Sequence, residues 1–190
     1  MKYLSIDIET TGLDPVDCQV LEFAAVLADT EDVETPVTGL RYFHTRVMPR
    51  AGRIHGELVA IGMHAKLFQD LIRGPSIRDC DLLDMFVDWA GAQGLSQAYT
   101  VAGKNFQGFD VRFLERLPGY YGGMFKHRVM DPAMLFMSAT DTSVPSLLVC
   151  KQRIGIDTPV AHTALEDALD VVRLIRVGLG GGEIKFVNSP

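Results

Sequence analysis

Two acidic residues near the start of the chain, Asp7 and Glu9, have the types and spacing to bind a metal ion. They lie in the short, largely apolar segment Lys2-Tyr-Leu-Ser-Ile-Asp-Ile-Glu-Thr-Thr-Gly-Leu13. Side chains alternate between the two faces of a β-strand, so these carboxylates point the same way while Ile6 and Ile8 point into the opposite layer. Two carboxylates on one face of a buried strand repel each other and resist ionising. A divalent cation removes this repulsion, and hard oxygen ligands suit Mg²⁺ or Mn²⁺.

Two further residues with this kind of chemistry, His162 and Asp167, lie near the end of the chain. Thr163-Ala-Leu-Glu166 is a capping-box pattern, which predicts that a helix begins at about position 164 with Thr163 as its N-cap. His162 then lies on the loop before the helix, and Asp167 lies one turn inside it. A loop histidine can swing toward a bound water, whereas a metal-binding aspartate needs a rigid scaffold.

A fourth acid, Asp110, is placed in a similar way at the start of a predicted helix. That helix has an apolar stripe, interpreted as core packing for most of its members: Phe106, Phe109, Phe113 and Leu117. Each of the three local patterns is weakly or moderately specific alone. Their joint occurrence, each on the type of element that the chemistry needs, predicts a metal-dependent site.

These motifs resemble those of the DEDD-type 3′-to-5′ exonucleases, the group that includes polymerase proofreading subunits, ribonuclease T and oligoribonuclease. Asp-Ile-Glu-Thr-Thr-Gly-Leu-Asp-Pro at positions 7–15 resembles the first motif of the family, and Asn105-Phe-Gln-Gly-Phe-Asp110 resembles the second. His162 and Asp167 match the third motif of the histidine subclass, His-x4-Asp. The tyrosine subclass would have tyrosine at position 163, where this chain has threonine. The motifs occur in family order, and the resemblance covers about residues 1–177.

The resemblance implies a two-metal mechanism with Mg²⁺ or Mn²⁺, which releases nucleoside 5′-monophosphates from the 3′ end of a strand. It implies that Asp7 bridges the ions, that Glu9 and Asp167 complete the shell of one, and that Asp110 reaches the other through water. An imidazole exchanges protons near neutral pH, so His162 is suited to accept a proton from the attacking water. The remaining histidines, His44, His55, His64 and His127, are interpreted as structural or surface residues.

The resemblance also implies a pocket for the terminal 3′ nucleotide around the first motif. Leu13 occupies the place of an apolar residue that wedges between bases, and Gly12 would let the backbone approach closely. We expect the helix over residues 57–68 to roof this pocket. The expected substrate-binding residues are Thr10, Thr11, Gly12, Leu13, Asn105 and Phe109.

The length of 190 residues predicts a single domain over residues 1–179, followed by a tail over 180–190. No apolar run is long enough for a membrane span, and the chain enters a strand without a signal peptide, so we expect a cytoplasmic protein. The three cysteines have no metal-ligand spacing and are expected to be reduced thiols: Cys18, Cys80 and Cys150.

The net charge of −6 is unusual for a nucleic-acid-binding protein, because a basic surface is the usual electrostatic sign. Four of the negative charges belong to the predicted ligands, and two divalent ions would change the sum from −6 to −2. The basic stretches 41–55 and 126–128 could contact phosphates or form an exposed strand edge and loop. The weak overall charge favours short single strands of DNA or RNA with a free 3′-hydroxyl.

The pattern of apolar residues predicts strands near 2–8, 19–28, 40–47, 98–103 and 128–130. It predicts helices near 57–72, 79–92, 109–117, 132–138, 144–153 and 164–177. The first three strands are spaced for antiparallel hairpins, and the later ones alternate with helices, which implies parallel crossovers. This order predicts an α/β protein of the ribonuclease H-like class, with a mixed five-stranded sheet flanked by helices.

Three other functions stay open from the sequence. One is a catalytically silent module that docks on a polymerase or another partner, and a second is an endonuclease of the same broad fold. The third is a metal-dependent phosphatase or nucleotidase that acts on small nucleotides. A homodimer and a polymerase partner are both compatible with the sequence.

Overall fold

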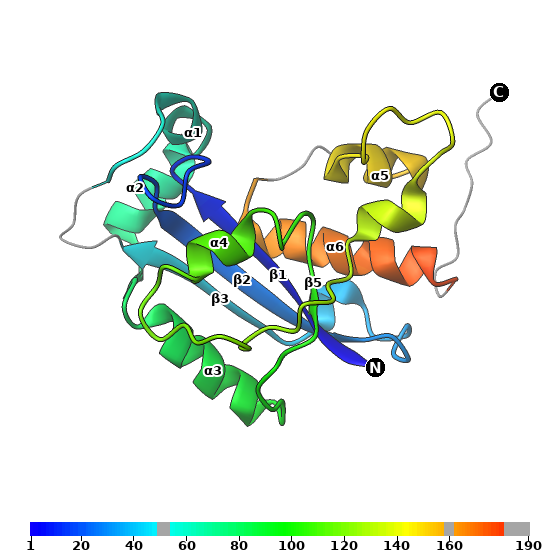
Figure 1. Cartoon of the computed structure of the whole chain (residues 1–190), viewed down its shortest axis with the longest axis horizontal. Coiled ribbons are helices and arrows are strands. Elements are labelled where there is room, and N and C mark those ends of the chain that lie inside the picture. The colour runs from blue at the N-terminus through cyan, green and yellow to red at the C-terminus, as the bar shows by residue number, and fades with distance from the viewer. Residues whose placement is uncertain (49–53, 158–161, 181–190) are drawn as a thin grey trace.

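The computed structural model describes residues 1–48, 54–157 and 162–180. Its five strands are β1 (Lys2–Thr10), β2 (Val20–Asp29), β3 (Tyr42–Met48), β4 (Ile77–Arg78) and β5 (Val101–Ala102), in the order β4-β3-β2-β1-β5. Figure 1 labels β3, β2, β1 and β5 side by side in this sheet. β1, β2 and β3 are antiparallel neighbours, whereas β4 pairs with β3 and β5 pairs with β1 in parallel. The predicted fold class, a mixed five-stranded sheet flanked by helices, is confirmed.

The prediction of a strand over 128–130 was wrong. Within the described residues this segment contributes one isolated bridge, from Met130 to Ala102, and the fifth strand is instead β4 at the opposite edge. β4 is only two residues long and exists because Ile77 lies beside Val47. A pairing this short depends on the approach of two distant segments, so it leaves no periodic pattern in the sequence.

The helices are α1 (Leu58–Met63), α2 (Ala65–Arg73), α3 (Leu82–Ala92), α4 (Asp110–Leu114), α5 (Leu147–Arg153) and α6 (Ala164–Gly178). Two 3₁₀ turns are η1 (Val37–Gly39) and η3 (Pro132–Phe136). The single helix expected over 57–72 is divided at His64 into α1 and α2, and the helix expected over 132–138 is the 3₁₀ turn η3. α4 ends three residues earlier than predicted, and α5 begins three residues later, where the Ser146 side chain caps it by accepting from the Val149 N–H.

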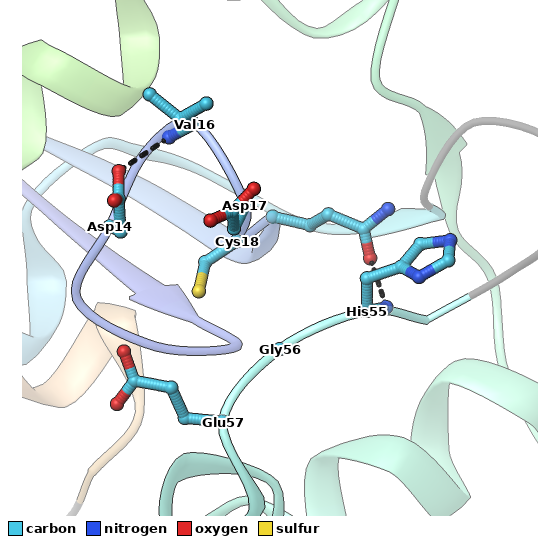
Figure 2. Close-up of a pocket in the computed structure, with 8 residues that line it drawn as sticks. Asp14, Val16, Asp17, Cys18, His55, Gly56 and Glu57 are labelled. Carbon is cyan, nitrogen blue, oxygen red and sulfur yellow. Dashed lines mark hydrogen bonds between the residues drawn. The ribbon is translucent and has the colours of Figure 1, made fainter.

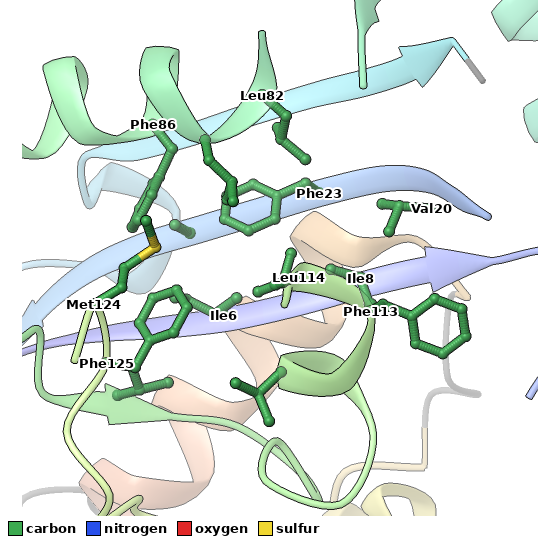
Figure 3. Packing of buried hydrophobic residues seen from close by; sticks show 14 of the residues in the cluster. Ile6, Ile8, Val20, Phe23, Leu82, Phe86, Phe113, Leu114, Met124 and Phe125 are labelled. Atoms are coloured by element: carbon green, nitrogen blue, oxygen red, sulfur yellow. The ribbon is translucent and has the colours of Figure 1, made fainter. Parts of the chain in front are cut away.

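The sheet buries a different layer on each face. On one face Ile6 and Ile8 of β1 pack with Phe23 of β2, Phe86 of α3 and Leu114 of α4 (Figure 3). The two β1 residues come from even-numbered positions, and all five side chains are almost completely buried. Because this layer anchors β1, the side chains at its odd-numbered positions are held in place on the opposite face.

The opposite face of the sheet is covered by α6. Tyr3 packs in a cluster with Ala168 and Val172, and the Ser5 hydroxyl donates to the Ala168 carbonyl at 2.7 Å. α6 therefore lies directly along the odd-numbered side chains of β1, the row that continues to Asp7 and Glu9.

No helix among residues 1–48, 54–157 and 162–180 is long and apolar enough to cross a membrane. Cys18 and Cys150 are buried, Cys80 is half-buried, and all three are free thiols as expected. The expected tail lies outside the described residues from 181 onward.

Candidate metal centre

Three carboxylates converge where the end of β1 meets the first turn of α6. One ligand oxygen from each of Asp7, Glu9 and Asp167 lies within 4.8 Å of the other two. Asp7 and Glu9 are two positions apart on β1 and share the face that α6 covers, as strand alternation predicts. The Asp167 N–H donates to the Thr163 carbonyl at 3.0 Å, which places Asp167 one turn inside the helix.

Asp110 approaches the same place from the edge of β1. Its carboxylate accepts a hydrogen bond from the Ile8 N–H at 3.2 Å, between the two acids of the first motif. The Leu4 N–H of β1 donates to Thr100 just before β5, and alternate N–H groups on a strand point to the same side. Along β1, the pairing with β5 covers Leu4 and Ser5, and farther along this edge the Asp110 carboxylate accepts the hydrogen bond that a longer strand would accept.

Burial favours the protonated forms of Asp7, Glu9 and Asp110 near neutral pH when no cation is present. Burial raises the pKa of Glu9 to about 8, and the nearby charges of Asp167, Glu22 and Asp110 contribute to this increase. Burial also raises the pKa of Asp110 to about 8, although backbone hydrogen bonds oppose the shift. For Asp7, burial and then the charges of Asp110, Asp167 and Glu9 raise the pKa well above its usual range.

These groups fit a divalent metal ion. Carboxylates that are buried against one another are stable as anions only beside a positive charge, because desolvation and mutual repulsion both oppose ionisation. All four donors are hard oxygens, which is the ligand type that Mg²⁺ and Mn²⁺ prefer. The described part of the chain therefore contains an acidic group able to hold such a cation.

The raised pKa values predict how the metal-free protein responds to pH. Glu9 and Asp110 have raised pKa values in the folded protein, so the folded state binds more protons than the unfolded state between about pH 4.5 and pH 8. The free energy of unfolding in chelator is therefore expected to fall as pH rises through this window, by up to about 1.4 kcal/mol per pH unit for each proton. Mg²⁺ should reverse the trend, because its binding requires the ionised carboxylates.

Thermal unfolding in chelator and in Mg²⁺ at about pH 6, 7, 8 and 9 measures this effect. The increase in melting temperature caused by Mg²⁺ should grow with pH, and Glu9→Gln should flatten both curves. A chelator curve that rises with pH across this window would contradict the protonated cluster.

Glu22, on β2 next to Glu9, supports the site and was not identified from the sequence. It is almost completely buried, lies opposite Glu9 in the strand register, and accepts from the Ala164 N–H at 2.9 Å. Burial opposes its charge, but hydrogen bonds from His44, at 2.7 Å, and from Ala164 hold the pKa of Glu22 below its usual range. A lone acid in the apolar run of β2 was the available sequence signal.

This bond replaces the predicted capping box of α6. Thr163 is the N-cap residue by position, as expected, but its side chain makes no capping hydrogen bond and Glu22 caps Ala164 instead. The local pattern was overridden because a buried carboxylate on β2 is closer to the first free N–H of the helix. Glu22 thus links α6, and with it Asp167, to the sheet.

His162 is an exposed loop residue directly before α6, as predicted. Its φ of 51° is in the left-handed region, which is uncommon for a residue with a side chain. Such conformations persist where the surrounding structure requires them, and they are frequent at active sites. His162 and His64 line one pocket of about 410 Å³, together with Glu22 and Thr163.

His64, interpreted from the sequence as structural, contacts the acidic cluster. It is 7% exposed, and its Nε2 lies 3.4 Å from a carboxylate oxygen of Glu9. Burial, and then the nearby His162, lower its pKa, so the ring is neutral beside Glu9. The break between α1 and α2 at His64 turns this side chain toward β1. No sequence motif marks the residue, because the contact depends on how the helix pair docks.

A second pocket, of about 260 Å³, opens beside Glu9 under α1. Four of the six expected substrate-binding residues line it: Thr10, Gly12, Leu13 and Phe109. α1 contributes Val59, Ala60 and Met63, so the expected roof is formed by the part of the 57–68 segment that lies before the break. Leu13 is 72% exposed at the rim.

Thr11 and Asn105, the other two expected binding residues, do not line this pocket. Thr11 is completely buried, and its hydroxyl accepts from the Gln19 N–H at 2.8 Å, so it stabilises the turn after β1. Asn105 has a φ of 57° and donates its N–H to Asp131 at 2.9 Å, which shapes the loop before α4.

The space above Gly12 is occupied by protein. A Cβ at this position would lie 2.6 Å from Cys18 Sγ and 2.8 Å from the Glu57 side chain, so any larger residue would displace both. Gly12 is therefore required by packing within the protein. Figure 2 shows Cys18 and Glu57 on the two sides of this turn, where they line a further pocket of about 760 Å³ with Asp14, Asp17 and His55.

The two basic stretches are only partly available for phosphates. Within 41–48 of the first stretch, His44 contacts Glu22, and Arg46 lies 3.3 Å from Asp70. Arg50 and Arg53 lie outside the described residues. Lys126, His127 and Arg128 of the second stretch are exposed.

No protein-family model matches the chain, and no curated protein matches it. Solved structures do match. Cell-death related nuclease 4 has a TM-score of 0.69 at 16% identity, over 95% of this chain and 64% of that one. The nuclease domain of 3′hExo, a DEDDh family member bound to rAMP, has a TM-score of 0.69 at 19% identity, over 95% and 92%. E. coli exonuclease I in complex with a dT13 oligonucleotide has a TM-score of 0.65 at 15% identity, over 93% and 40%.

These similarities concern the fold, since fewer than one residue in five is identical. The chain spans 64% of the cell-death related nuclease and 40% of exonuclease I. The five-stranded sheet and its flanking helices agree with the fold that the resemblance implied. The chain has the ribonuclease H-like fold of the DEDDh 3′-exonucleases, with an acidic cluster that could bind metal ions.

Proposed function

We propose that this protein is a metal-dependent 3′-to-5′ exonuclease that releases nucleoside 5′-monophosphates from short single strands of DNA or RNA. The observation that carries the proposal is the position of the acidic cluster, whose Glu9 forms part of the wall of the 260 Å³ pocket. A nucleotide base in this apolar pocket would place its own phosphate next to Asp7 and Glu9.

The four acids would hold two Mg²⁺ or Mn²⁺ ions. When bound, the ions supply a more acidic water and neutralise charge on the scissile phosphate. Asp7, whose charge neighbours are Asp110, Asp167 and Glu9, would hold the ions together with these three carboxylates. One carboxylate oxygen of Asp110 accepts from the Ile8 N–H at the edge of β1, and this hydrogen bond also fixes the orientation of the other oxygen.

His162 would accept the proton of the attacking water. Its loop position leaves the ring exposed, so the proton can pass on to solvent. The neutral ring of His64 would orient Glu9 and close the space between the two pockets, which excludes water from one side of the cluster. Leu13, Phe109 and Met63 would hold the base by stacking and apolar contact, which discriminates little between bases.

Three of the similar structures support the substrate class. The 3′hExo nuclease domain was solved bound to rAMP, and exonuclease I was solved with the dT13 oligonucleotide. In a third similar structure, a 3′-exonuclease recognises the 3′ end of a histone mRNA stem-loop. A pocket that accepts a nucleoside monophosphate next to metal ligands is what release of terminal nucleotides requires.

The test is cleavage of a 5′-end-labelled single strand in Mn²⁺. A ladder that shortens from the 3′ end, blocked by a 3′-phosphate and by chelator, would support the exonuclease. Internal cuts would indicate an endonuclease, and release of inorganic phosphate alone a phosphatase. If a folded protein that binds Mn²⁺ cleaves nothing, it is a silent module.

Substrate length gives a separate prediction. The net charge of −6 provides little long-range attraction for a polymer, so we expect rates on strands of a few nucleotides to match or exceed those on long strands. The ratio of kcat/KM for a short and a long single strand measures this. Faster degradation of long duplex DNA would mean that a basic surface, with residues 41–55 as the first candidate, contributes to binding.

A further inference from the structure

The 260 Å³ pocket contains a second carboxylate, Glu57, that the proposed metal centre does not use. Glu57 is the residue directly before α1 and lines the pocket beside the turn that follows β1. It is not a member of the acidic cluster formed by Asp7, Glu9 and Asp167. Glu57 is exposed at the rim of this mainly apolar pocket, and it also lines the neighbouring 760 Å³ pocket.

Glu57 is held in position by three contacts with the turn after β1. Its N–H donates to the Thr11 carbonyl at 2.8 Å, and its Oε1 accepts from the Leu13 N–H at 3.0 Å. The side-chain carbons lie against Gly12, where no Cβ could fit. Figure 2 shows the side chain running along this turn and away from His55. The carboxylate is thus oriented before any ligand binds, so little entropy would be lost on binding.

The second oxygen of Glu57 remains available. Over residues 1–48, 54–157 and 162–180, Glu57 Oε2 makes no hydrogen bond or ion pair. The other polar side chains of the pocket are engaged: the Thr10 hydroxyl donates to the Gly12 carbonyl at 2.7 Å, and Glu9 lies beside His64. A ligand that fills the pocket would displace water from the side of Glu57 that faces it, and a donor on that ligand would replace the lost hydrogen bonds.

The sugar of a 3′-terminal nucleotide provides such donors. The base fits the apolar walls of Leu13, Met63 and Phe109, whereas the sugar hydroxyls are the donors of a free 3′ end. Ribose presents two neighbouring hydroxyls, which can both donate to one carboxylate, and deoxyribose presents one. A 3′-phosphate would bring negative charge against Glu57 and Glu9, which is unfavourable.

We infer that Glu57 is a specificity-determining residue that accepts hydrogen bonds from the sugar hydroxyls of the 3′-terminal nucleotide and selects ribose over deoxyribose. The inference rests on the proposed function and extends it from nucleic acid in general to strands with a 3′-terminal ribonucleotide. The 2′-hydroxyl is the group by which proteins distinguish RNA from DNA at a given position.

Glu57→Gln separates this role from that of a residue that only stabilises the turn after β1. The amide oxygen of glutamine can still accept from the Leu13 N–H, so the turn is preserved, but the anionic acceptor is lost. Asp17→Asn is the matched control, because Asp17 is an exposed acid of the same turn that lines the other pocket (Figure 2). Both variants change the charge by the same amount.

The experiment compares kcat/KM in Mn²⁺ for two short strands that differ only in the sugar of the 3′-terminal nucleotide. The wild type should favour ribose by about tenfold or more, the difference expected for one hydrogen bond to a charged group. Glu57→Gln should reduce this ratio to nearly one, and Asp17→Asn should leave the ratio unchanged. If Glu57→Gln lowers kcat/KM equally for both strands, Glu57 only stabilises the turn and the inference is overturned. A wild-type preference for deoxyribose would also overturn it.

Equilibrium binding of AMP and 2′-deoxy-AMP to the wild type, with Mg²⁺, gives a readout that needs neither cleavage nor a folded variant. AMP should bind about tenfold more tightly, and equal affinities would overturn the inference. If the wild type cleaves no strand yet prefers AMP, the proposed exonuclease fails while the sugar selectivity of Glu57 stands.

Discussion

Asp7→Asn is expected to abolish metal-dependent cleavage while leaving the protein folded and, in chelator near pH 8, more stable than the wild type. Asp7 lies among Glu9, Asp110 and Asp167, and every one of these charges raises its pKa. Loss of a single preorganised electrostatic contact already costs about 10²- to 10³-fold in rate. Loss of the central ligand should therefore cost at least about 10³-fold. The metal-free protein gains stability because one group of a mutually repelling set no longer ionises.

Single-turnover cleavage in Mg²⁺ and in Mn²⁺ measures the first effect, and thermal unfolding in chelator measures the second. Asp17→Asn, which removes an exposed acid of the neighbouring turn, serves as the control for the change in net charge. Cleavage that persists in chelator, or an Asp7→Asn protein that keeps wild-type rates, would refute the two-metal proposal.

His162→Ala is expected to lower kcat by about 10²- to 10⁴-fold, the range typical of a lost general base. The affinity for Mg²⁺ and for nucleoside monophosphate should change little, because His162 lies outside both the acidic cluster and the 260 Å³ pocket. A loss in kcat without a change in binding is the signature of a group that acts only in the transition state. Added imidazole should restore part of the activity, which a purely structural role would not allow.

Thr163→Ala is the matched control, since Thr163 is the next residue, is exposed, and makes no capping hydrogen bond. It should keep nearly the wild-type rate. If His162→Ala instead prevents Mg²⁺ binding, as measured by titration calorimetry, the histidine is a ligand and the assigned role is wrong.

Local sequence pattern was sufficient for the parts of the site that lie within one element. Asp7 and Glu9 share a face because side chains alternate along β1, and Asp167 lies one turn inside α6 because the helix begins at Ala164. The antiparallel pairing of the first three strands also followed from spacing and periodicity. These features depend on backbone geometry that repeats every two or 3.6 residues. They can therefore be predicted from residues that are close together in the sequence.

Contacts between distant segments, in contrast, were not visible in the pattern. His64 reaches Glu9 only because the expected helix breaks at this residue, and Glu22 caps α6 across a separation of 142 residues. Glu57 enters the pocket because its backbone bonds to Thr11. Each of these side chains is polar, and a polar residue in a sequence is equally compatible with a solvated surface. Which ones come to lie beside the acidic cluster and its pocket is decided by how α1, α2 and α6 pack on the sheet, since these contacts exist only in the folded protein.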